Sequence, residues 1–444
     1  MKITIIGAGK SGIAAALLAK RKGYEVFLTE KKQSDDCQEA IEILQKQNID
    51  YEFGNHTPES LRNSELVVTS PGVPPDNDII KLAEQKQIKI ISELEFAYNF
   101  LENPIIAITG TNGKTTTTTL TTFIFNHSGR KAISAGNIGT PLSDLVDNIN
   151  RETIVVVEAS SFQLDRIEKF KPDVAIILNI SPDHLYYHKT MENYVSAKWK
   201  IFCNQNEKDL LILNADDNEL IKAAGQSRGK VAWFSMNPVE YGIFGNQGKM
   251  IARLTDNEEV IMLFDDIRIP GIHNAYNSMA AALAARAFEI RNENIRDSLM
   301  AFQGVEHRLE YVATIDGVDY INDSKATNVN ATWYALSSYN EPIIWIAGGR
   351  GDSNDYSQLD TIVSQKVKCI IAIGEEADNI FNHFSAMKRC FKEPTLLYAV
   401  LKAKEVADKG DVVLFTPACK SFDMFLNYEH RGEVFKEIIK ELES

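Results

Sequence analysis

The sequence lacks the features that mark several large classes of protein. It has only five cysteines, none in a CxxC pair, which argues against a disulfide framework or a structural zinc site and suits a reducing cytoplasm. No apolar run approaches the roughly 18 residues needed to span a bilayer. The opening MKITIIGAGKSG reads as a strand and a glycine turn, not as a signal peptide. We therefore predict a soluble, cytoplasmic protein without membrane insertion.

Positive charge is also scarce. Lys and Arg number 47 against 61 Asp and Glu, a formal net charge of −14 over 444 residues. Such a chain is not expected to attract nucleic acid or an anionic membrane through its overall field, and an anionic substrate looks unfavourable at first sight. With 25 glycines, 13 prolines and 44% hydrophobic residues, the composition is ordinary and excludes a collagen-like or disordered chain. A monomer is the default expectation.

Apolar strands alternate with amphipathic helices along almost the whole chain, which is typical of α/β domains with mainly parallel sheets. At roughly 150 residues per domain, the length predicts about three domains. The strand–helix pattern restarts twice, so we expect domains at 1–93, 94–304 and 305–444. In the last of these, Asp316-Gly317 between two alternating strands predicts a β-hairpin.

The first glycine motif, Gly7-Ala8-Gly9-Lys10-Ser11-Gly12, follows a strand and matches G-x-G-x-x-G. Its glycines permit a tight turn and close backbone approach, and the helix that follows offers amide donors to a diphosphate. Glu30 ends the second strand, where a ribose-binding acid is expected. The motif favours a nucleotide diphosphate without implying nicotinamide. A turn needed only for helix–strand packing is the alternative.

A second loop is more specific. Thr109-Gly110-Thr111-Asn112-Gly113-Lys114-Thr115-Thr116 lies between a predicted strand and a Thr-rich helix. Backbone N–H groups of such a loop wrap ATP phosphates, the lysine contacts the terminal ones, and the hydroxyl after it can ligate Mg²⁺. The full pattern would have glycine at Ile108, so a chance Gly-Lys-Thr is the alternative.

Polar residues also follow neighbouring strands of this segment. Glu158 ends strand 154–157, His184 follows strand 174–178, and Asn137 lies in a glycine turn. Ligands gather at the carboxyl ends of parallel strands, and glutamate and asparagine oxygens suit Mg²⁺, whereas histidine is softer. Taken singly, each could be a solvated loop residue. Lys198 lies on a predicted helix and, taken alone, would belong to a solvated helix face.

The third segment groups polar residues after its strands as well. Arg308 lies in Glu306-His307-Arg308-Leu309-Glu310, and Asn322-Asp323-Ser324-Lys325-Ala326-Thr327-Asn328 follows strand 318–322. Asp323 and Thr327 have a competing interpretation as caps of the next helix. Cys419 follows strand 412–416 and is interpreted as structural, because no partner base is apparent.

Taken together, several motifs closely resemble those of the Mur ligase family of peptidoglycan synthesis. In chain order they are GTNGKTT, EASSFQLD, NISPDH, SAKWKIF, GIHNAYN, HRLE, NDSKATN and PACKSFDMF. NDSKATN, PACKSFD and the first glycine turn are similar to members that add D-glutamate. The resemblance implies a Rossmann-like N-terminal domain, a central P-loop ATPase-like domain and a Rossmann-like C-terminal domain. It implies that ATP, with Mg²⁺, activates UDP-N-acetylmuramoyl-L-alanine as an acyl phosphate, which D-glutamate then attacks.

The resemblance also implies roles for individual residues. For ATP it implies Gly110, Thr111, Asn112, Gly113, Lys114, Thr115, Thr116, Asn274, Arg308 and Asp323. For metal it implies Thr115, Asn137, Glu158, His184 and Lys198, the lysine as a carbamate. For the UDP substrate it implies Ser11, Glu30, Lys31, Ser70, Gly72 and Asn137, and for D-glutamate Lys325, Thr327, Ser421 and Tyr428. The implied catalytic residues are Lys114, Glu158, His184 and Lys198.

Three positions depart from the family pattern. Arg350-Gly351-Asp352 occupies a turn where a lysine is common, which leaves Arg350 as a possible substitute. Tyr186 stands where an acid is common, and Tyr428 where phenylalanine is.

Other functions explain less of the sequence. An NAD-dependent dehydrogenase built on Gly7–Gly12 would leave Gly110–Thr115 without a role. An L-alanine-adding Mur ligase or a folate polyglutamate ligase is disfavoured by NDSKATN. Retention of Lys198 and His184 disfavours a nucleotide-binding protein without ligase chemistry.

Overall fold

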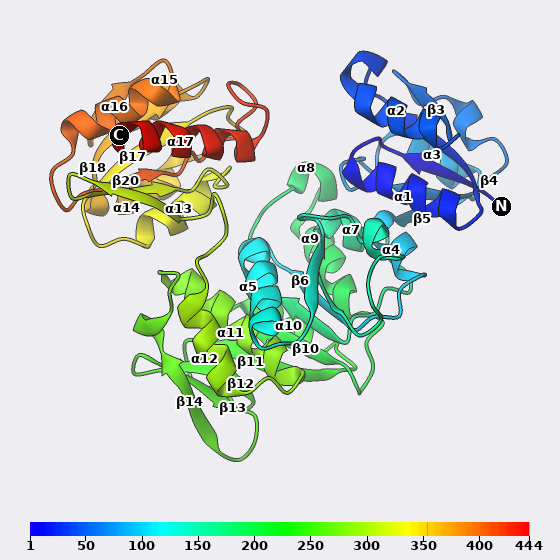
Figure 1. Cartoon of the computed structure of the whole chain (residues 1–444), viewed down its shortest axis with the longest axis horizontal. Helices are drawn as coiled ribbons and strands as arrows, with labels where there is room; N and C mark the ends of the chain where they lie inside the picture. Colours follow the sequence, from blue (N-terminus) through cyan, green and yellow to red (C-terminus); the bar gives the residue numbers. More distant parts are fainter. Residues whose placement is uncertain (353, 444) are drawn as a thin grey trace. The chain divides into compact units, whose positions relative to one another are not determined.

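The computed structural model describes residues 1–352 and 354–443 and consists of two compact units. The first unit comprises residues 1–267 and 276–302, and the second comprises 268–275 and the residues from 303 onward. The first unit contains two β-sheets and the second contains another, each packed with helices (Figure 1). The predicted α/β class with mainly parallel sheets is confirmed. Among the described residues, no helix combines the length and apolar character that a membrane span requires.

The N-terminal sheet of the first unit is wholly parallel, in the order β3-β2-β1-β4-β5. Its elements are β1 (Lys2–Ile6), α1 (Lys10–Arg21), β2 (Glu25–Glu30), α2 (Gln38–Lys46), β3 (Asp50–Phe53), β4 (Ser64–Thr69), α3 (Asp78–Gln85), β5 (Lys89–Ser92) and α4 (Glu93–Tyr98). The strand order reverses between β1 and β4. The loops that follow these two strands therefore flank a switch point, where open α/β sheets bind ligands.

The larger sheet of the first unit runs β14-β13-β12-β11-β10-β9-β6-β8-β7. The strands and helices of this part are β6 (Ile105–Thr109), α5 (Lys114–His127), β7 (Ala132–Gly136), α6 (Leu142–Leu145), β8 (Ile154–Glu158), α7 (Ser161–Asp165), β9 (Val174–Ile177), α8 (Leu185–His188), α9 (Met191–Trp199), β10 (Leu210–Asn214), α10 (Asn218–Ala224), β11 (Lys230–Ser235), β12 (Gly242–Asn246), β13 (Lys249–Arg253), β14 (Glu258–Leu263), α11 (Ile272–Ala287) and α12 (Asn292–Ala301). The first four residues of α11 belong to the second unit. Strands β6, β8 and β9 are buried throughout, which explains their continuous apolar runs. Strands β12 to β14 pair antiparallel.

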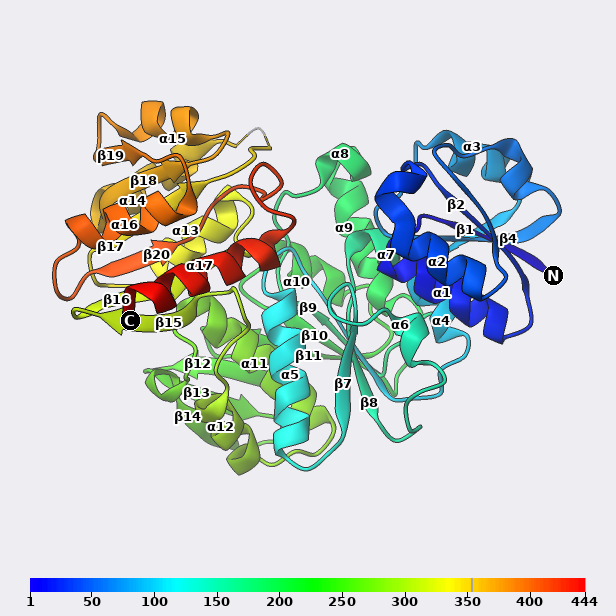
Figure 2. The same cartoon turned by 45° about the horizontal axis from the view of Figure 1, so that its top comes forward.

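The second unit contains the sheet β15-β16-β20-β17-β18-β19. Its elements are β15 (Glu310–Ile315), β16 (Val318–Asn322), α13 (Val329–Ser337), β17 (Ile343–Gly348), α14 (Asp360–Lys366), β18 (Val367–Ile373), α15 (Ala377–Phe384), β19 (Arg389–Lys392), α16 (Leu396–Val406), β20 (Val412–Phe415) and α17 (Tyr428–Glu443). Helices α13, α14 and α15 pack on one face of the sheet, and α16 and α17 pack on the other (Figure 2). The hairpin predicted at Asp316-Gly317 is confirmed, since β15 and β16 pair antiparallel and both turn residues have positive φ.

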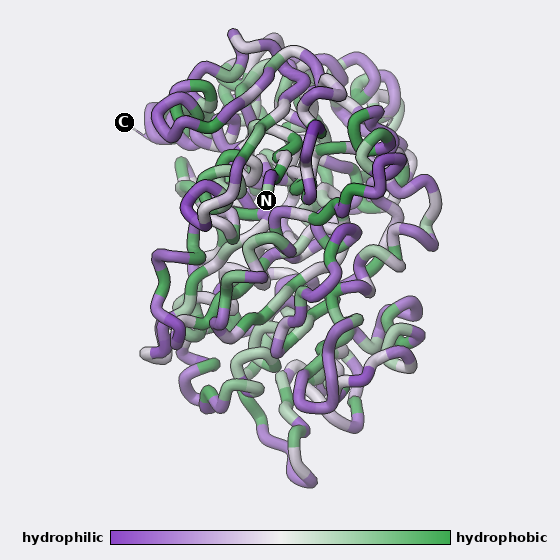
Figure 3. The backbone as a smooth tube through the Cα atoms, turned by 90° about the vertical axis from the view of Figure 1, so that its right-hand side faces the viewer, coloured by the Kyte–Doolittle hydropathy of each residue, from purple (hydrophilic) through white to green (hydrophobic). Residues whose placement is uncertain are grey.

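The hydropathy of each segment of the chain follows its burial in the structure. Figure 3 shows hydrophobic (green) stretches alternating with hydrophilic (purple) ones, with purple over many connecting loops. Helix α1 illustrates how the pattern works locally, because its alanines and Leu18 are buried against the N-terminal sheet. Gly12 lies on the same helix, where a Cβ atom would come within 1.8 Å of the Gly7 carbonyl oxygen. The last glycine of the first motif is therefore required by helix–strand packing, as the structural alternative proposed.

This contact predicts different tolerances for two glycines of one motif. We expect Gly12→Ala to destabilise the protein by about 2 kcal/mol or more, because helix α1 must move away from β1. Gly9→Ala is the matched control, since a Cβ there would meet nothing within 4 Å, and its effect should stay within about 0.5 kcal/mol. Urea unfolding of the ligand-free variants measures both. Equal stability of the two variants would contradict the packing argument.

Candidate active site

The phosphate-type loop predicted from the sequence connects β6 to α5. Gly110 and Gly113 have positive φ of 151° and 83°, and Gly113 forms the N-terminal cap of α5. The Lys114 side chain folds back over the loop, where its Nζ donates hydrogen bonds to the carbonyl oxygens of Gly110 (3.1 Å) and Thr111 (2.9 Å). Thr115 is almost buried in the first turn of the helix. The loop thus presents the N-terminus of α5, an ammonium and a hydroxyl, which is a suitable cradle for phosphates.

Lys198 lies on helix α9, yet its side chain is only 2% exposed. Its Nζ donates to the Gly110 carbonyl at 2.7 Å, the same oxygen that Lys114 approaches. Burial first, and then the nearby Lys114 ammonium, hold the pKa of Lys198 well below its usual range. The expectation of a solvated helix face is wrong for Lys198, because α9 packs this side chain against the loop. Lys200 is 37% exposed and pairs with Asp165.

The carboxyl ends of β8 and β9 carry the other predicted residues of this site. Glu158 is 2% exposed, and its Oε1 accepts a hydrogen bond from Asn137 Nδ2 at 2.8 Å. Its Oε2 is buried without a hydrogen-bond partner among the described residues. His184 has a positive φ of 53° and lies against the Phe162 ring, with a centroid distance of 4.8 Å. A buried carboxylate oxygen with no partner is suited to receive a cation.

The switch point of the N-terminal sheet holds a pocket of about 420 Å³. The structure brings five of the predicted UDP-substrate residues together in its lining: Ser11, Glu30, Lys31, Ser70 and Gly72. Asn137 does not line this pocket and lies beside Glu158 instead. Glu30 Oε2 accepts from the Ala8 N–H at 2.7 Å, which ties the acid to the glycine turn. Lys10 and Lys32 also line the pocket and add positive charge to it. His56 lines it too, but burial lowers the pKa of its ring, so it stays neutral near pH 7.

In the second unit, Asp323, Lys325 and Thr327 follow β16, Ser421 follows β20, Arg308 precedes β15 and Tyr428 begins α17. Asp323 is buried and accepts hydrogen bonds from the Leu309 N–H (3.2 Å) and the Thr416 hydroxyl (2.8 Å). Burial raises its pKa to about 6, against the opposing effect of Arg308. The cap of α13 is Asn328, whose Oδ1 accepts from the Ala331 N–H. The capping interpretation is therefore wrong for Asp323 and Thr327.

Of the D-glutamate candidates, Lys325 and Tyr428 lie together. The Lys325 ammonium lies 5.2 Å from the centre of the Tyr428 ring, and Ser421 is buried after β20. The ATP candidate Asn274 donates from its Nδ2 to the Pro270 carbonyl at 2.7 Å.

Cys419 is buried, and burial raises the pKa of its thiol to about 11. It therefore stays protonated near neutral pH, in agreement with the structural interpretation.

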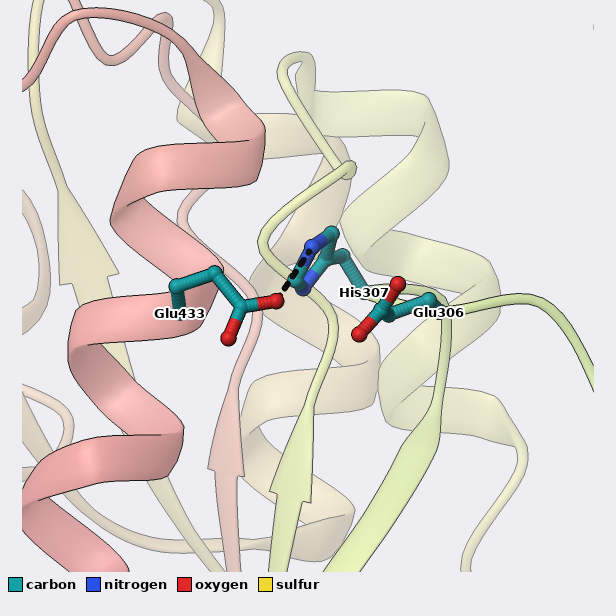
Figure 4. A group of neighbouring side chains, drawn as sticks. All are labelled: Glu306, His307 and Glu433. Atoms are coloured by element: carbon teal, nitrogen blue, oxygen red, sulfur yellow. Dashed lines mark ion pairs between the residues drawn. The ribbon is translucent and has the colours of Figure 1, made fainter. Parts of the chain in front are cut away.

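Another group, Glu306, His307 and Glu433, brings potential metal-ligating atoms within 4.8 Å of one another (Figure 4). Lys436 forms ion pairs with Glu306 and with Glu433 (2.9 Å). An ammonium therefore already balances these carboxylates. The His307 ring is buried, and its Nδ1 lies 3.0 Å from Asn322 Nδ2. These side chains already have partners within the protein, and we therefore do not assign a metal to them.

Comparisons with known proteins identify the family of the chain. Residues 1–92 match the family model described as "Mur ligase MurD-like, N-terminal domain", 108–285 match "Mur ligase middle domain", and 307–419 match "Mur ligase, glutamate ligase domain". A relative from Salinibacter ruber, named UDP-N-acetylmuramoylalanine--D-glutamate ligase, is 43% identical over 453 residues, covering 99% of this chain and 98% of the relative. The chain belongs to the Mur ligase family.

Other relatives of this Mur ligase extend the likeness. A protein of the same name from Koribacter versatilis is 41% identical over 99% of this chain and 97% of its own. The solved UDP-N-acetylmuramate-alanine ligase of Thermotoga maritima covers 100% of both chains with a TM-score of 0.61 and 20% identity. A pseudomurein peptide ligase type C from Methanothermus fervidus reaches a TM-score of 0.60 at 20% identity, covering 99% of both chains. At this identity the structural likenesses show the fold alone.

Several residues near the predicted sites were not singled out from the sequence. Asn179 exchanges two hydrogen bonds with the backbone of Asn112, at 2.9 and 3.1 Å. The Tyr194 hydroxyl lies 3.0 Å from Thr111 Oγ1. Asn277 on α11 lies so close to the loop that a Cβ on Gly113 would come within 2.4 Å of its Oδ1. Both asparagines lie inside motifs that the sequence analysis quoted, NISPDH and GIHNAYN. The motifs therefore pointed to these residues, but only the structure shows their proximity to the phosphate-type loop.

Proposed function

We propose that this Mur ligase joins D-glutamate to UDP-N-acetylmuramoyl-L-alanine at the expense of ATP, giving an amide, ADP and phosphate. The relatives that cover 99% of the chain carry the name of this activity. The geometric observation that supports it most is the phosphate-type loop beside two lysine amines at the Gly110 carbonyl. We further propose that it acts in the cytoplasm as a monomer.

The chemistry explains why such a site is needed. A carboxylate is a poor acyl donor, so its oxygen first attacks the γ-phosphorus of ATP and ADP leaves. The D-glutamate amine then attacks the acyl phosphate and loses a proton, and the tetrahedral intermediate expels phosphate. The first step brings together two anions. Lys114 and the amides at the start of α5 lower the cost of that approach and stabilise the charge that develops.

We assign one reactant to each predicted domain. Residues 1–93 would bind the UDP substrate in the pocket lined by Ser11, Glu30, Lys31, Ser70 and Gly72. Residues 94–304 would bind the ATP phosphates at Gly110–Thr116. Asn274 of this range, and Arg308 and Asp323 of residues 305–444, are proposed as further nucleotide-binding residues. Residues 305–444 would bind D-glutamate through Lys325, Thr327, Ser421 and Tyr428.

Magnesium fits the residues at the carboxyl ends of β6 and β8. The buried, partnerless Oε2 of Glu158 is a hard anionic oxygen, and Thr115 and Asn137 supply further oxygens. We propose that these residues and His184 hold Mg²⁺. When bound, the metal supplies positive charge that offsets the phosphate and carboxylate charges.

Lys198 can join these proposed magnesium ligands only if its side chain becomes an anion. An ammonium cannot ligate a cation, but the lowered pKa of Lys198 favours the neutral amine. A neutral amine adds to CO₂ and releases a proton, which leaves an anionic carbamate. We propose that Lys198 carries this carbamate and thereby becomes an oxygen ligand beside Glu158.

The reaction is tested by phosphate release with ATP, Mg²⁺ and UDP-N-acetylmuramoyl-L-alanine against a panel of amino acids. We expect D-glutamate to stimulate release, whereas L-glutamate, D-aspartate and L-alanine should not. Stimulation by another amino acid in place of D-glutamate would overturn the substrate assignment. No stimulation by any of them would overturn the ligase activity.

The carbamate is tested by Lys198→Ala, with Lys200→Ala, just beyond the end of α9, as a control. We expect the first variant to lose at least about 100-fold in activity and to regain part of it with bicarbonate or a short carboxylate such as acetate. The control should stay within about twofold of wild type, because Lys200 is partly exposed and pairs with Asp165. Wild-type activity in Lys198→Ala would refute the carbamate role.

A further inference from the structure

One buried guanidinium fixes two loops at the carboxyl edge of the sheet in the second unit. Arg431 on α17 is 0% exposed. Its Nε and Nη2 donate to the hydroxyl and carbonyl of Ser324, at 3.0 and 2.7 Å, and its Nη1 donates to the Cys419 carbonyl at 3.0 Å. The residues that follow these two anchors are Lys325 and Lys420. Arg431 therefore holds the backbones from which two lysine side chains emerge.

The turn after β17 packs against the same place. A Cβ on Gly349 would lie 2.3 Å from the Lys420 carbonyl oxygen, so only glycine allows this approach. Arg350 and Lys420 then exchange two backbone hydrogen bonds, at 2.9 and 3.0 Å, as an isolated antiparallel bridge. Lys420 is thus held on both sides and directly precedes Ser421, one of the residues proposed to bind D-glutamate.

The cationic side chains near Ser421 differ in the groups that their N–H donors already contact. The Arg350 guanidinium makes a two-pronged ion pair with Glu375, at 3.0 and 2.8 Å. Arg431 uses its donors on the two loops. Lys420 Nζ contacts the Asp352 carboxylate at 2.8 Å, and these side chains are 42% and 62% exposed. Such an exposed pair stabilises little, and an ammonium has three donors, so Lys420 can bind a second anion.

We propose that Lys420 binds a carboxylate of D-glutamate with the donors of its ammonium that do not contact Asp352. This inference rests on the proposed function. D-Glutamate carries two carboxylates, and in a chain with a net charge of −14 they must be received by local cations. Lys325 is one such cation, and Lys420 supplies another from the neighbouring loop. Arg350, which the sequence left as a substitute, makes a two-pronged pair with Glu375, a geometry that fixes its guanidinium better than a single contact fixes the Lys420 ammonium.

The test compares Lys420→Ala with Arg350→Ala, which removes the same charge from the facing position of the bridge. We expect Lys420→Ala to raise the KM for D-glutamate roughly 10- to 100-fold, the usual effect of losing a hydrogen bond to a charged group. The KM values for ATP and the UDP substrate should not change. Arg350→Ala should leave all three within about twofold. Lys420→Arg should keep most of the affinity for D-glutamate.

A double variant tests whether the ammonium must come from residue 420 to lower the KM for D-glutamate, or whether any positive charge in this pair of side chains is enough. In Lys420→Ala/Asp352→Lys the ammonium comes from the other side of the same pair, and we expect a several-fold recovery of the KM for D-glutamate. Thermal melting checks that each variant is folded. If Lys420→Ala does not fold, Lys420→Gln takes its place, with the same expected KM values.

Wild-type kinetics separate the two proposals. If the wild type shows no D-glutamate-dependent phosphate release, the proposed function is wrong. If the wild type is active and Lys420→Ala has an unchanged KM for D-glutamate, or raises the KM for ATP equally, only the role of Lys420 is wrong.

Discussion

Two lysine amines share one carbonyl oxygen in the loop between β6 and α5 of the first unit. Lys114 and Lys198 both donate to Gly110, and Lys198 is buried there. Like charges so close together are unfavourable in a buried place unless an anion joins them or one amine gives up its proton. The site therefore favours binding of phosphates beside Lys114 and an uncharged or carbamylated Lys198. An acidic protein can in this way handle anionic substrates, because the attraction is local.

Both units form such sites in the same way, at the carboxyl ends of parallel strands. Parallel strands end at a common edge, so loops far apart in sequence meet there. In the first unit the loops after β6, β8 and β9 bring together the phosphate loop, Glu158 and His184. In the second unit the loops after β16, β17 and β20 bring together Lys325, Arg350 and Lys420, with Arg431 fixing two of these loops from α17. Residue types that look unremarkable singly acquire a function from this convergence.

Features set by local patterns were predictable from the sequence. The apolar runs of β6, β8 and β9, the glycine loops and the Asp316-Gly317 hairpin all appear where expected, because burial and turn geometry leave few alternatives. The burial of Lys198 was not predictable, since nothing in the helix sequence shows which face packs on the loop. Asp323 was ambiguous for the same reason. Its partner Thr416 lies 93 positions away in the chain, so only the tertiary structure distinguishes it from a cap.

The central claim is that the carboxylate of the UDP substrate is activated by direct phosphorylation. Labelling both oxygens of its alanine carboxylate with ¹⁸O tests this most directly, with mass spectrometry of the phosphate released during D-glutamate addition. One carboxylate oxygen attacks phosphorus and then leaves with it when the acyl C–O bond breaks. The account predicts one ¹⁸O atom in each released phosphate. Phosphate free of ¹⁸O would contradict it.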